Sequence, residues 1–473
     1  MLRDEYIFQI KRSLGVAPTQ EQHQALDTFV QFLLSEGGRE VMLLCGSAGT
    51  GKTTLGSAIV RSMVRMGQRV VLLAPTGRSA KVFAQNSGLP ASTIHRKIYR
   101  QREVGELYSQ FSLSPNLHGN TLFFVDEASM ISMGHGDLRS LLDDLIQYVY
   151  GGKHCRLVLI GDAAQLPPVG EEESPALQAA VLQGYGLDVF SSTLNEVLRQ
   201  SEQSGILFNA TAIRRLITHD EATLMPKVRF CGFADIRRVP GDELIESISS
   251  SYDQVGMDET MIITRSNKRA NLFNQGIRNT ILGREEELTR GDWLMVVKNK
   301  YLKTGEMGED NEGETFIANG DRAVVQRVRN VHTMHGFRFA DVLLEFPDYD
   351  NQELQTTLIL ESLTAEAPQL TAEQTEALYL SILADYSDIT SKRELRKAVR
   401  ADRYFNALQA KYAYAVTCHK AQGGQWAHIY LDQGYMTEEM LTPDYIHWLY
   451  TAFTRATEKL FLINWPAVQC EEE

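Results

Sequence analysis

Cysteine is scarce in this chain, which has five cysteines among 473 residues. They are scattered, form no C-x-x-C pair, and are Cys45, Cys155, Cys231, Cys418 and Cys470. Paired spacings mark zinc sites, and dense cysteines mark the disulfide frameworks of small secreted domains. The sequence therefore argues against both kinds of site. It fits a reducing compartment, and we expect a cytoplasmic protein.

Long hydrophobic runs are also missing. No apolar stretch approaches the roughly 20 residues that a membrane-spanning helix needs, and Met1–Glu5 does not have the pattern of a signal peptide. No tandem repeat or low-complexity tract is present. The hydrophobic content of 43% and charged content of 23% are ordinary for globular proteins. We expect roughly three or four domains and no membrane partner.

The chain lacks an excess of positive charge, since its formal net charge is −13. Nucleic-acid binders often have a basic balance, so this charge counts mildly against one. Part of the acid lies in three short runs, which we interpret as solvated loops and tail: Glu171–Glu173, Glu285–Glu287 and Glu471–Glu473. A locally basic groove on an acidic body remains compatible with this composition.

The strongest local pattern is Gly46–Thr53, which matches G-x-x-x-x-G-K-[ST] at every fixed position. The apolar run Glu40–Cys45 predicts a buried strand before it, and Thr54–Met66 has helical spacing after it. Backbone N–H groups in such a loop, together with the start of the helix, attract phosphates. Lys52 would reach the β- and γ-phosphates, and the Thr53 hydroxyl would ligate Mg²⁺. The predicted cofactors are therefore ATP and Mg²⁺.

The residues that we predict to bind nucleotide in this loop are consecutive. They are Gly46, Ser47, Ala48, Gly49, Thr50, Gly51, Lys52, Thr53 and Thr54.

A phosphate loop requires an acidic partner, and the apolar run Leu122–Val125 leads directly into Asp126 and Glu127. We predict that Asp126 holds Mg²⁺, directly or through water, and that Glu127 polarises the attacking water. Gln165 follows a further buried strand at 157–162. Beyond the end of that strand it can touch a γ-phosphate or its water and couple nucleotide state to a neighbouring domain.

The remaining chain alternates helical and strand patterns. Residues 5–36 predict helices with a break at 15–18, and the region from about Leu194 to Thr218 reads as mainly helical. Short strands joined by glycine-rich turns over 288–346 predict a small antiparallel barrel or sandwich. Residues 350–408 read as polar and mostly helical, with a basic face that by default is solvated.

In their order and spacing, these motifs resemble superfamily 1 DNA helicases of the 5′-to-3′ branch, the RecD-like and Dda-like enzymes. The resemblance covers most of the chain and is weak over 97–119 and 350–408. Besides the phosphate loop, it is carried by Ala74–Arg78, Ser92–His95, Val125–Met130, Gly161–Val169, Thr417–Gly423 and Tyr450–Ala456. Cys418 stands where an aliphatic residue is commoner.

The resemblance implies an α/β fold with two RecA-like parallel-sheet domains, a small wedge inserted in the first and an SH3-like β-barrel inserted in the second. The expected ranges are 1–96 and 120–190 for domain 1, 97–119 for the wedge, 191–287 and 409–473 for domain 2, and 288–408 for the barrel with its polar helical extension. Tyr108 and Phe111 are the candidates for splitting the duplex.

The resemblance also implies roles for single residues. Gln22 would read adenine, Gly424 would contact the nucleotide, and Arg199 and Arg455 would reach the γ-phosphate. The implied catalytic set is Lys52, Asp126, Glu127, Gln165, Arg199 and Arg455. The implied DNA-binding set is Pro75, Thr76, Ser92, His95, Thr417 and His419.

The function implied is ATP-dependent translocation 5′-to-3′ on single-stranded DNA with unwinding of duplex, of the kind used in DNA repair and recombination. The implied partners are single-stranded and forked duplex DNA, and we expect the chain to be active as a monomer. Two alternatives remain open. In the first alternative, the chain is a DNA-stimulated ATPase clamp without unwinding. In the second, it is a motor subunit of a larger nuclease complex. No nuclease carboxylate cluster is apparent in the sequence.

Overall fold

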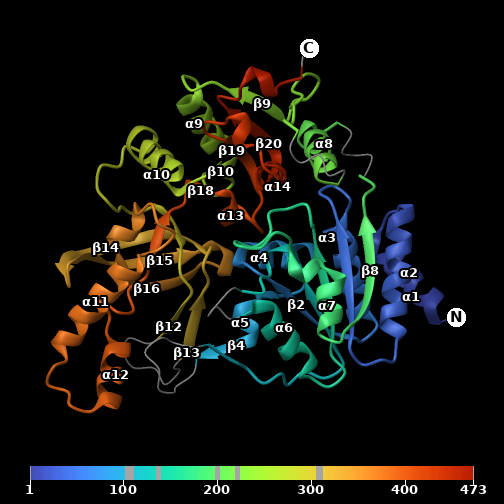
Figure 1. The fold of residues 1–473 in the computed structure, drawn as a ribbon, viewed down its shortest axis with the longest axis horizontal. Coiled ribbons are helices and arrows are strands. Elements are labelled where there is room, and N and C mark those ends of the chain that lie inside the picture. Colours follow the sequence, from blue (N-terminus) through green and yellow to red (C-terminus); the bar gives the residue numbers. More distant parts are fainter. Residues whose placement is uncertain are drawn as a thin grey trace. The chain divides into compact units, whose positions relative to one another are not determined.

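The structure is a computed structural model that describes residues 2–101, 111–134, 140–197, 203–218, 224–304 and 313–471. The chain divides into two compact units, each described by itself below. Figure 1 draws the helices and strands with the labels used here. The first unit comprises Met1–Ile98, Leu113–Gly241 and Ala421–Glu473, and the second comprises Tyr99–Ser112 and Asp242–Lys420. No helix in the described part of the chain is both long and apolar enough to cross a membrane.

A six-stranded parallel sheet organises the first unit, in the order β3-β2-β6-β7-β1-β8. Its strands are β1 (Glu40–Gly46), β2 (Arg69–Ala74), β3 (Ala91–Thr93), β6 (Thr121–Val125), β7 (Arg156–Gly161) and β8 (Asp188–Leu194). All carboxyl ends of a parallel sheet lie at one edge, which is where open α/β sheets bind ligands. The buried strands predicted around the phosphate loop and before Asp126 are confirmed.

Helices cover this sheet and close its core. They are α1 (Leu2–Leu14), α2 (Gln20–Leu34), α3 (Lys52–Arg65), α4 (Gly77–Ser87), α5 (Ile94–Ile98), α6 (Leu141–Tyr150) and α7 (Ala179–Gly184). The predicted helix break is confirmed, since Gly15 adopts a φ of 76° and Thr19 caps α2. Phe29 and Phe32 of α2 are fully buried in the same cluster as Phe124 of β6. Burying such aromatic side chains is a major source of stability.

The first unit also holds three strands in the order β19-β20-β9, paired in parallel. They are β9 (Ile236–Val239), β19 (Trp426–Asp432) and β20 (Ala456–Ile463), and α8 (Gly205–Thr218) packs against α14 (Pro443–Phe453). The helix expected from Leu194 starts later. Leu194 instead ends β8, because its register against Gly46 of β1 extends the sheet to this point.

The second unit contains an antiparallel sheet in the order β16-β15-β14-β11-β17. Its strands are β11 (Trp293–Val296), β14 (Arg322–Met334), β15 (Phe337–Phe346), β16 (Gln352–Ile359) and β17 (Ala410–Tyr412). Leu408, just before β17, donates to Thr357 O of β16 and accepts from Ile359 N–H. The two edges thus meet, as in a small barrel. The antiparallel architecture agrees with the prediction, and its SH3-like character stays a prediction.

Further elements of the second unit are β10 (Thr260–Thr264) in parallel with β18 (Ala415–Thr417), α9 (Leu244–Val255), α10 (Asn267–Gly276) and the hairpin of β12 (Lys300–Thr304) and β13 (Gly313–Ile317). In the predicted wedge, β4 (Tyr99–Gln101) pairs with β5 (Phe111–Leu113). Tyr108 lies outside the described residues, as does the side chain of Phe111. The splitting residue therefore remains a prediction.

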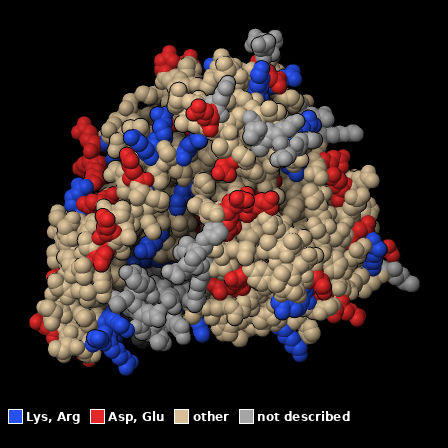
Figure 2. All heavy atoms as spheres, viewed as in Figure 1, with Lys and Arg blue, Asp and Glu red and all other residues tan. Residues whose placement is uncertain are grey.

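Residues 350–408 are only partly helical. Their first segment is β16, because it completes the barrel, and α11 (Ala372–Asp385) and α12 (Lys392–Ala401) follow. These helices pack on the β15 side of the barrel through Phe339, Ile382 and Val399. Lys and Arg side chains gather over α12 at the surface (Figure 2), where Lys392 and Lys397 are exposed. This exposure agrees with the predicted solvated basic face.

Asp292, directly before β11 of the barrel, has a buried carboxylate that accepts several hydrogen bonds. Asp292 is fully buried, and its Oδ1 accepts from Arg278 Nε at 3.0 Å, Arg284 at 2.7 Å and the Tyr414 hydroxyl at 2.9 Å. Its Oδ2 accepts from Thr289 N–H at 2.8 Å. Burial opposes ionisation, but the hydrogen bonds from Arg278 and Thr289 hold the pKa of Asp292 below its usual value. The carboxylate is therefore ionised at neutral pH.

We expect Asp292→Asn to destabilise the protein by about 3–5 kcal/mol, because it leaves the buried Arg278 and the partly buried Arg284 without their counter-charge. The pKa of Asp292 is lowered in the folded state, so its contribution is present above the unfolded pKa of about 3.9 and is lost as pH falls through the folded value. Denaturant unfolding at neutral and acidic pH measures both effects. The exposed Asp388→Asn is the matched control, and equal midpoints for the two variants would contradict this role.

Candidate active site

The phosphate loop has the strand–loop–helix context that the sequence predicts. Gly49 and Gly51 adopt φ values of 78° and 79°, a left-handed conformation that favours glycine. A Cβ atom added to Gly46 would lie 2.8 Å from the Leu194 carbonyl oxygen, so only glycine fits there without a shift. Because α3 begins at Lys52, its N-terminus faces the loop and supplies positive potential.

The Lys52 side chain makes its hydrogen bond within the phosphate loop itself. Its Nζ donates to Ser47 O at 2.8 Å and lies 3.9 Å from Asp162 Oδ2. Its side chain is 13% exposed, so a bound phosphate can replace the Ser47 carbonyl as its partner. The Thr50 hydroxyl also donates to Ser47 O, at 2.8 Å, which stiffens the loop.

The two acids after β6 lie at the same edge. Asp126 is buried, and its Oδ1 accepts from Glu127 N–H at 2.9 Å. Burial, with the nearby Glu127 charge, raises the pKa of Asp126 to about 7. Glu127 has a φ of 53°, an unusual conformation for a non-glycine residue and one that is often stored at functional sites.

These residues fit Mg²⁺. A buried carboxylate whose ionised form is disfavoured gains from a cation, and the Thr53 hydroxyl lines the same pocket as Asp126. Mg²⁺ prefers oxygen ligands and usually takes one or two protein carboxylates together with phosphates and waters.

Gln165 and Arg455 complete the pocket. Gln165 is buried, and its Oε1 has no hydrogen-bond partner in the described part of the chain, so it is available to a bound water. The Arg455 side chain is 2% exposed and donates to Thr451 O, Gly424 O and the Thr454 hydroxyl. Its guanidinium lies 3.9 Å from Glu127 Oε1.

Most of the predicted nucleotide and catalytic residues therefore line one pocket of about 420 Å³. They are Ser47, Ala48, Gly49, Gly51, Lys52, Thr53, Thr54, Asp126, Glu127, Gln165 and Arg455. This volume is within the range of small-molecule sites. The pocket also includes residues that the sequence analysis missed, among them Ser204, Leu207, Gln425 and Thr457.

Four described residues that were predicted to bind nucleotide do not line this pocket: Gly46 and Thr50 of the loop itself, and Gln22 and Gly424. The Gln22 amide accepts from Thr19 N–H at 3.1 Å and donates to Thr50 O at 3.0 Å. Gln22 therefore links the start of α2 to the backbone of the phosphate loop. The Gly424 carbonyl accepts from Arg455 at 3.2 Å. Arg199 lies outside the described residues. The nucleotide contacts of all these residues stay predictions.

The DNA-binding residues predicted in the first unit cluster at one edge of its sheet. Strands β2 and β3 are parallel neighbours, with Leu73 opposite Ser92, so Pro75 and Thr76 follow one strand end close to the other. The Thr76 hydroxyl caps α4. His95 is partly buried, and this burial lowers its pKa to about 4. The His95 ring is therefore neutral at pH 7.

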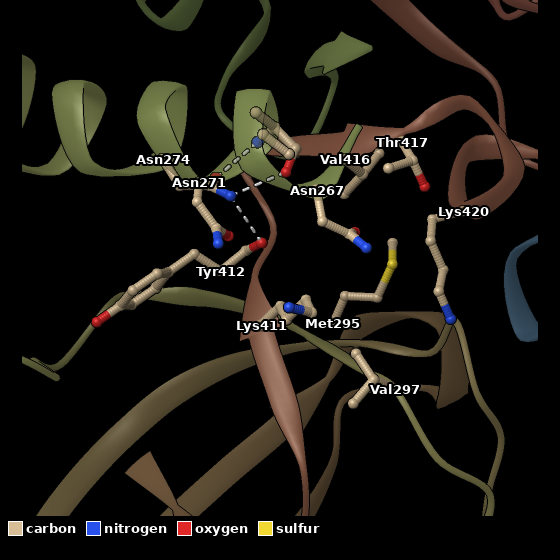
Figure 3. A pocket seen from close by; sticks show the side chains of 12 residues that line it. Asn267, Asn271, Asn274, Met295, Val297, Lys411, Tyr412, Val416, Thr417 and Lys420 are labelled. Carbon is tan, nitrogen blue, oxygen red and sulfur yellow. Dashed lines mark hydrogen bonds between the residues drawn. The ribbon is translucent and has the colours of Figure 1, made fainter. Parts of the chain in front are cut away.

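In the second unit, Thr417 ends β18 and lines a small cavity (Figure 3). His419 follows it on α13 (Cys418–Ala421) and is exposed. The cavity volume of about 20 Å³ has room for roughly one water. Two lysines that the sequence analysis missed, Lys411 and Lys420, line it, and burial lowers the pKa of each to about 8. Both are mostly charged at neutral pH.

Two family models match the chain. The model described as "AAA domain" matches residues 18–223, and "UvrD-like helicase C-terminal domain" matches residues 412–463. The "ATP-dependent RecD2 DNA helicase" of Deinococcus radiodurans is 33% identical over 69% of this chain and 42% of its own length. The chain is thus similar to superfamily 1 helicases of the RecD-like and Dda-like branch.

Two further proteins are similar to the chain. The "ATP-dependent DNA helicase dda" of Enterobacteria phage T4 is 28% identical over 58% of the chain and 60% of its own length. The chain thus spans less than two thirds of both relatives. A crystal structure of Pif1 helicase from Bacteroides in complex with ADP-AlF3 and ssDNA aligns over 97% of this chain and 95% of the Pif1 chain. The sequence identity is 16% and the TM-score is 0.48.

Proposed function

We propose that this chain is a superfamily 1, ATP-dependent DNA helicase that moves 5′-to-3′ along single-stranded DNA and unwinds duplex. The observation that supports it most is a single pocket lined by Lys52, by the acids Asp126 and Glu127, and by Arg455. These groups come from segments far apart in the chain. Together they provide every part that phosphoryl transfer to water needs. The direction of travel rests on the family resemblance.

In this proposal each side chain has a definite task. The loop amides and Lys52 hold the phosphates, Glu127 takes a proton from the attacking water, and the Gln165 amide oxygen orients that water. Arg455 stabilises the charge that develops on the transferring phosphoryl group. Thr53 and Asp126 would hold Mg²⁺, which neutralises phosphate charge when it is bound.

DNA contacts are proposed in each unit separately. The strand-end residues Thr76 and Ser92 offer hydroxyls to the sugar–phosphate backbone, as Thr417 does in the second unit. Lys411 and Lys420 add positive charge near Thr417. Backbone contacts of these kinds do not depend on sequence, as a motor that travels along a strand requires. We propose that the chain acts as a monomer on single-stranded and forked DNA.

The deciding experiment measures strand separation on duplexes that bear either a 5′ or a 3′ single-stranded tail, with and without ATP and Mg²⁺. We expect unwinding of the 5′-tailed substrate alone, and only with ATP. DNA-stimulated hydrolysis without strand separation would instead select the clamp or the motor subunit of a larger complex.

A further inference from the structure

A tyrosine hydroxyl lies at the phosphate loop and belongs to none of the tasks above. Tyr450 of α14 accepts from the Ala48 N–H at 3.0 Å and donates to Asp162 Oδ2 at 2.6 Å. Tyr450 and Asp162 are both 1% exposed. Burial, together with the neighbouring Asp162 charge, raises the pKa of Tyr450 well above its usual value, so the hydroxyl keeps its proton.

This hydroxyl joins three segments of the first unit. Ala48 belongs to the phosphate loop, Asp162 follows β7, and Tyr450 lies in the last turn of α14. Asp162 is itself fixed, because its Oδ1 accepts from Ala164 N–H at 3.1 Å. The carboxylate therefore orients the Tyr450 proton away from the loop, and the hydroxyl oxygen is left to accept from Ala48.

The same end of α14 makes further contacts with the loop that carries Gln165. The Thr451 hydroxyl accepts from Leu166 N–H at 2.7 Å, and a His447 ring nitrogen lies 2.9 Å from Ala164 O. The Arg455 Nε in turn donates to Thr451 O at 3.1 Å. A chain of direct contacts thus runs from the phosphate loop, through Tyr450 and the adjacent Thr451, to Arg455.

We propose that Tyr450 is a positioning residue for ATP hydrolysis, whose hydroxyl holds the end of α14 in register with the phosphate loop and thereby places Arg455 at the γ-phosphate. This inference rests on the proposed function. Small misplacements of a catalytic group are costly, since about 1 Å can reduce the rate on the order of 10²-fold. A group that acts through Arg455 should affect turnover rather than ground-state binding.

The test replaces one hydroxyl and compares it with another on the same helix. Tyr450→Phe removes the bridge, whereas Tyr445→Phe removes a buried hydroxyl that donates to Gln433 Oε1 at 2.7 Å, away from the pocket residues. We expect Tyr450→Phe to lower kcat for DNA-stimulated ATP hydrolysis by about tenfold or more, with KM and the affinity for a non-hydrolysable ATP analogue changed by less than about twofold. Tyr445→Phe should match the wild type, and thermal melting confirms that both variants fold.

A double-mutant cycle identifies the route of the effect. Arg455→Lys keeps the positive charge but loses the position of the guanidinium. If Tyr450 acts through Arg455, adding Tyr450→Phe to this variant should lower kcat little further. A full additional tenfold loss would overturn the proposal, as would a Tyr450→Phe variant that resembles Tyr445→Phe or that changes KM alone. If the wild type hydrolyses no ATP, the proposed function has failed instead, and the two failures are distinguishable.

Discussion

Replacement of Lys52 by alanine should reduce ATP hydrolysis by at least about 10²–10³-fold, the loss found when a preorganised electrostatic donor is removed from an active site. Lys52 faces the pocket, and its only hydrogen bond in the described part of the chain is to a carbonyl of its own loop, Ser47 O at 2.8 Å. Among the described residues, no other lysine lines that pocket. The measurement is steady-state phosphate release with and without single-stranded DNA.

The fold should survive this change. Lys52 is the first residue of α3, where alanine is well tolerated, and its side chain is partly exposed. Lys153→Ala is the matched control, because Lys153 is exposed and absent from the pocket. Robust turnover by a folded Lys52→Ala protein would refute the assignment of the nucleotide site.

Arg455→Ala should lose hydrolysis on the order of 10³-fold or more, as expected when an arginine stabilises the transferring phosphoryl group. ATP binding should persist, because the loop amides and Lys52 still hold the phosphates. Equilibrium binding of a fluorescent ATP analogue, measured beside phosphate release, separates the two effects. A variant that loses binding while bound ATP still turns over would contradict the transition-state role.

This variant needs a control for stability. Arg455 is buried and donates to Thr451 O and Gly424 O, which alanine would leave without that donor. Arg455→Lys retains the charge and should recover part of the stability but little of the activity, because lysine cannot reproduce the planar fork of arginine. Arg61→Ala, which removes hydrogen bonds to Asn86 O and Ser13 O in the first unit, controls for the loss of a partly buried arginine away from the pocket.

The phosphate loop could be predicted because its physics is local. Glycines at Gly49 and Gly51, an apolar strand before them and a helix after them fix the backbone within one short segment. The acids after β6 could be predicted for the same reason, since an apolar run that ends in Asp126 places the carboxylate at the strand end. Asp162 ends the neighbouring strand in the same way, and this signal could have found it.

Other features had no local signal. Tyr450 lies 402 positions from Ala48 along the chain, and only packing brings its hydroxyl to the loop. The strand β16 reads as part of a polar helical region, yet pairing with β15 over eight residues outweighs its local preference. Likewise, the register of β8 against β1 extends the sheet through Leu194, where the sequence predicts a helix.

The sequence by itself indicated a triphosphate-binding loop and its acids, because each short segment carries its own backbone geometry. The late arginine was indicated only by resemblance to a helicase family. Tertiary structure alone decided that Lys52 and Arg455 share one pocket, that Gln22 braces the loop and that Tyr450 joins the loop to α14. The reason is physical. Contacts between distant segments depend on how buried strands and helices pack, and no spacing along the chain encodes that packing.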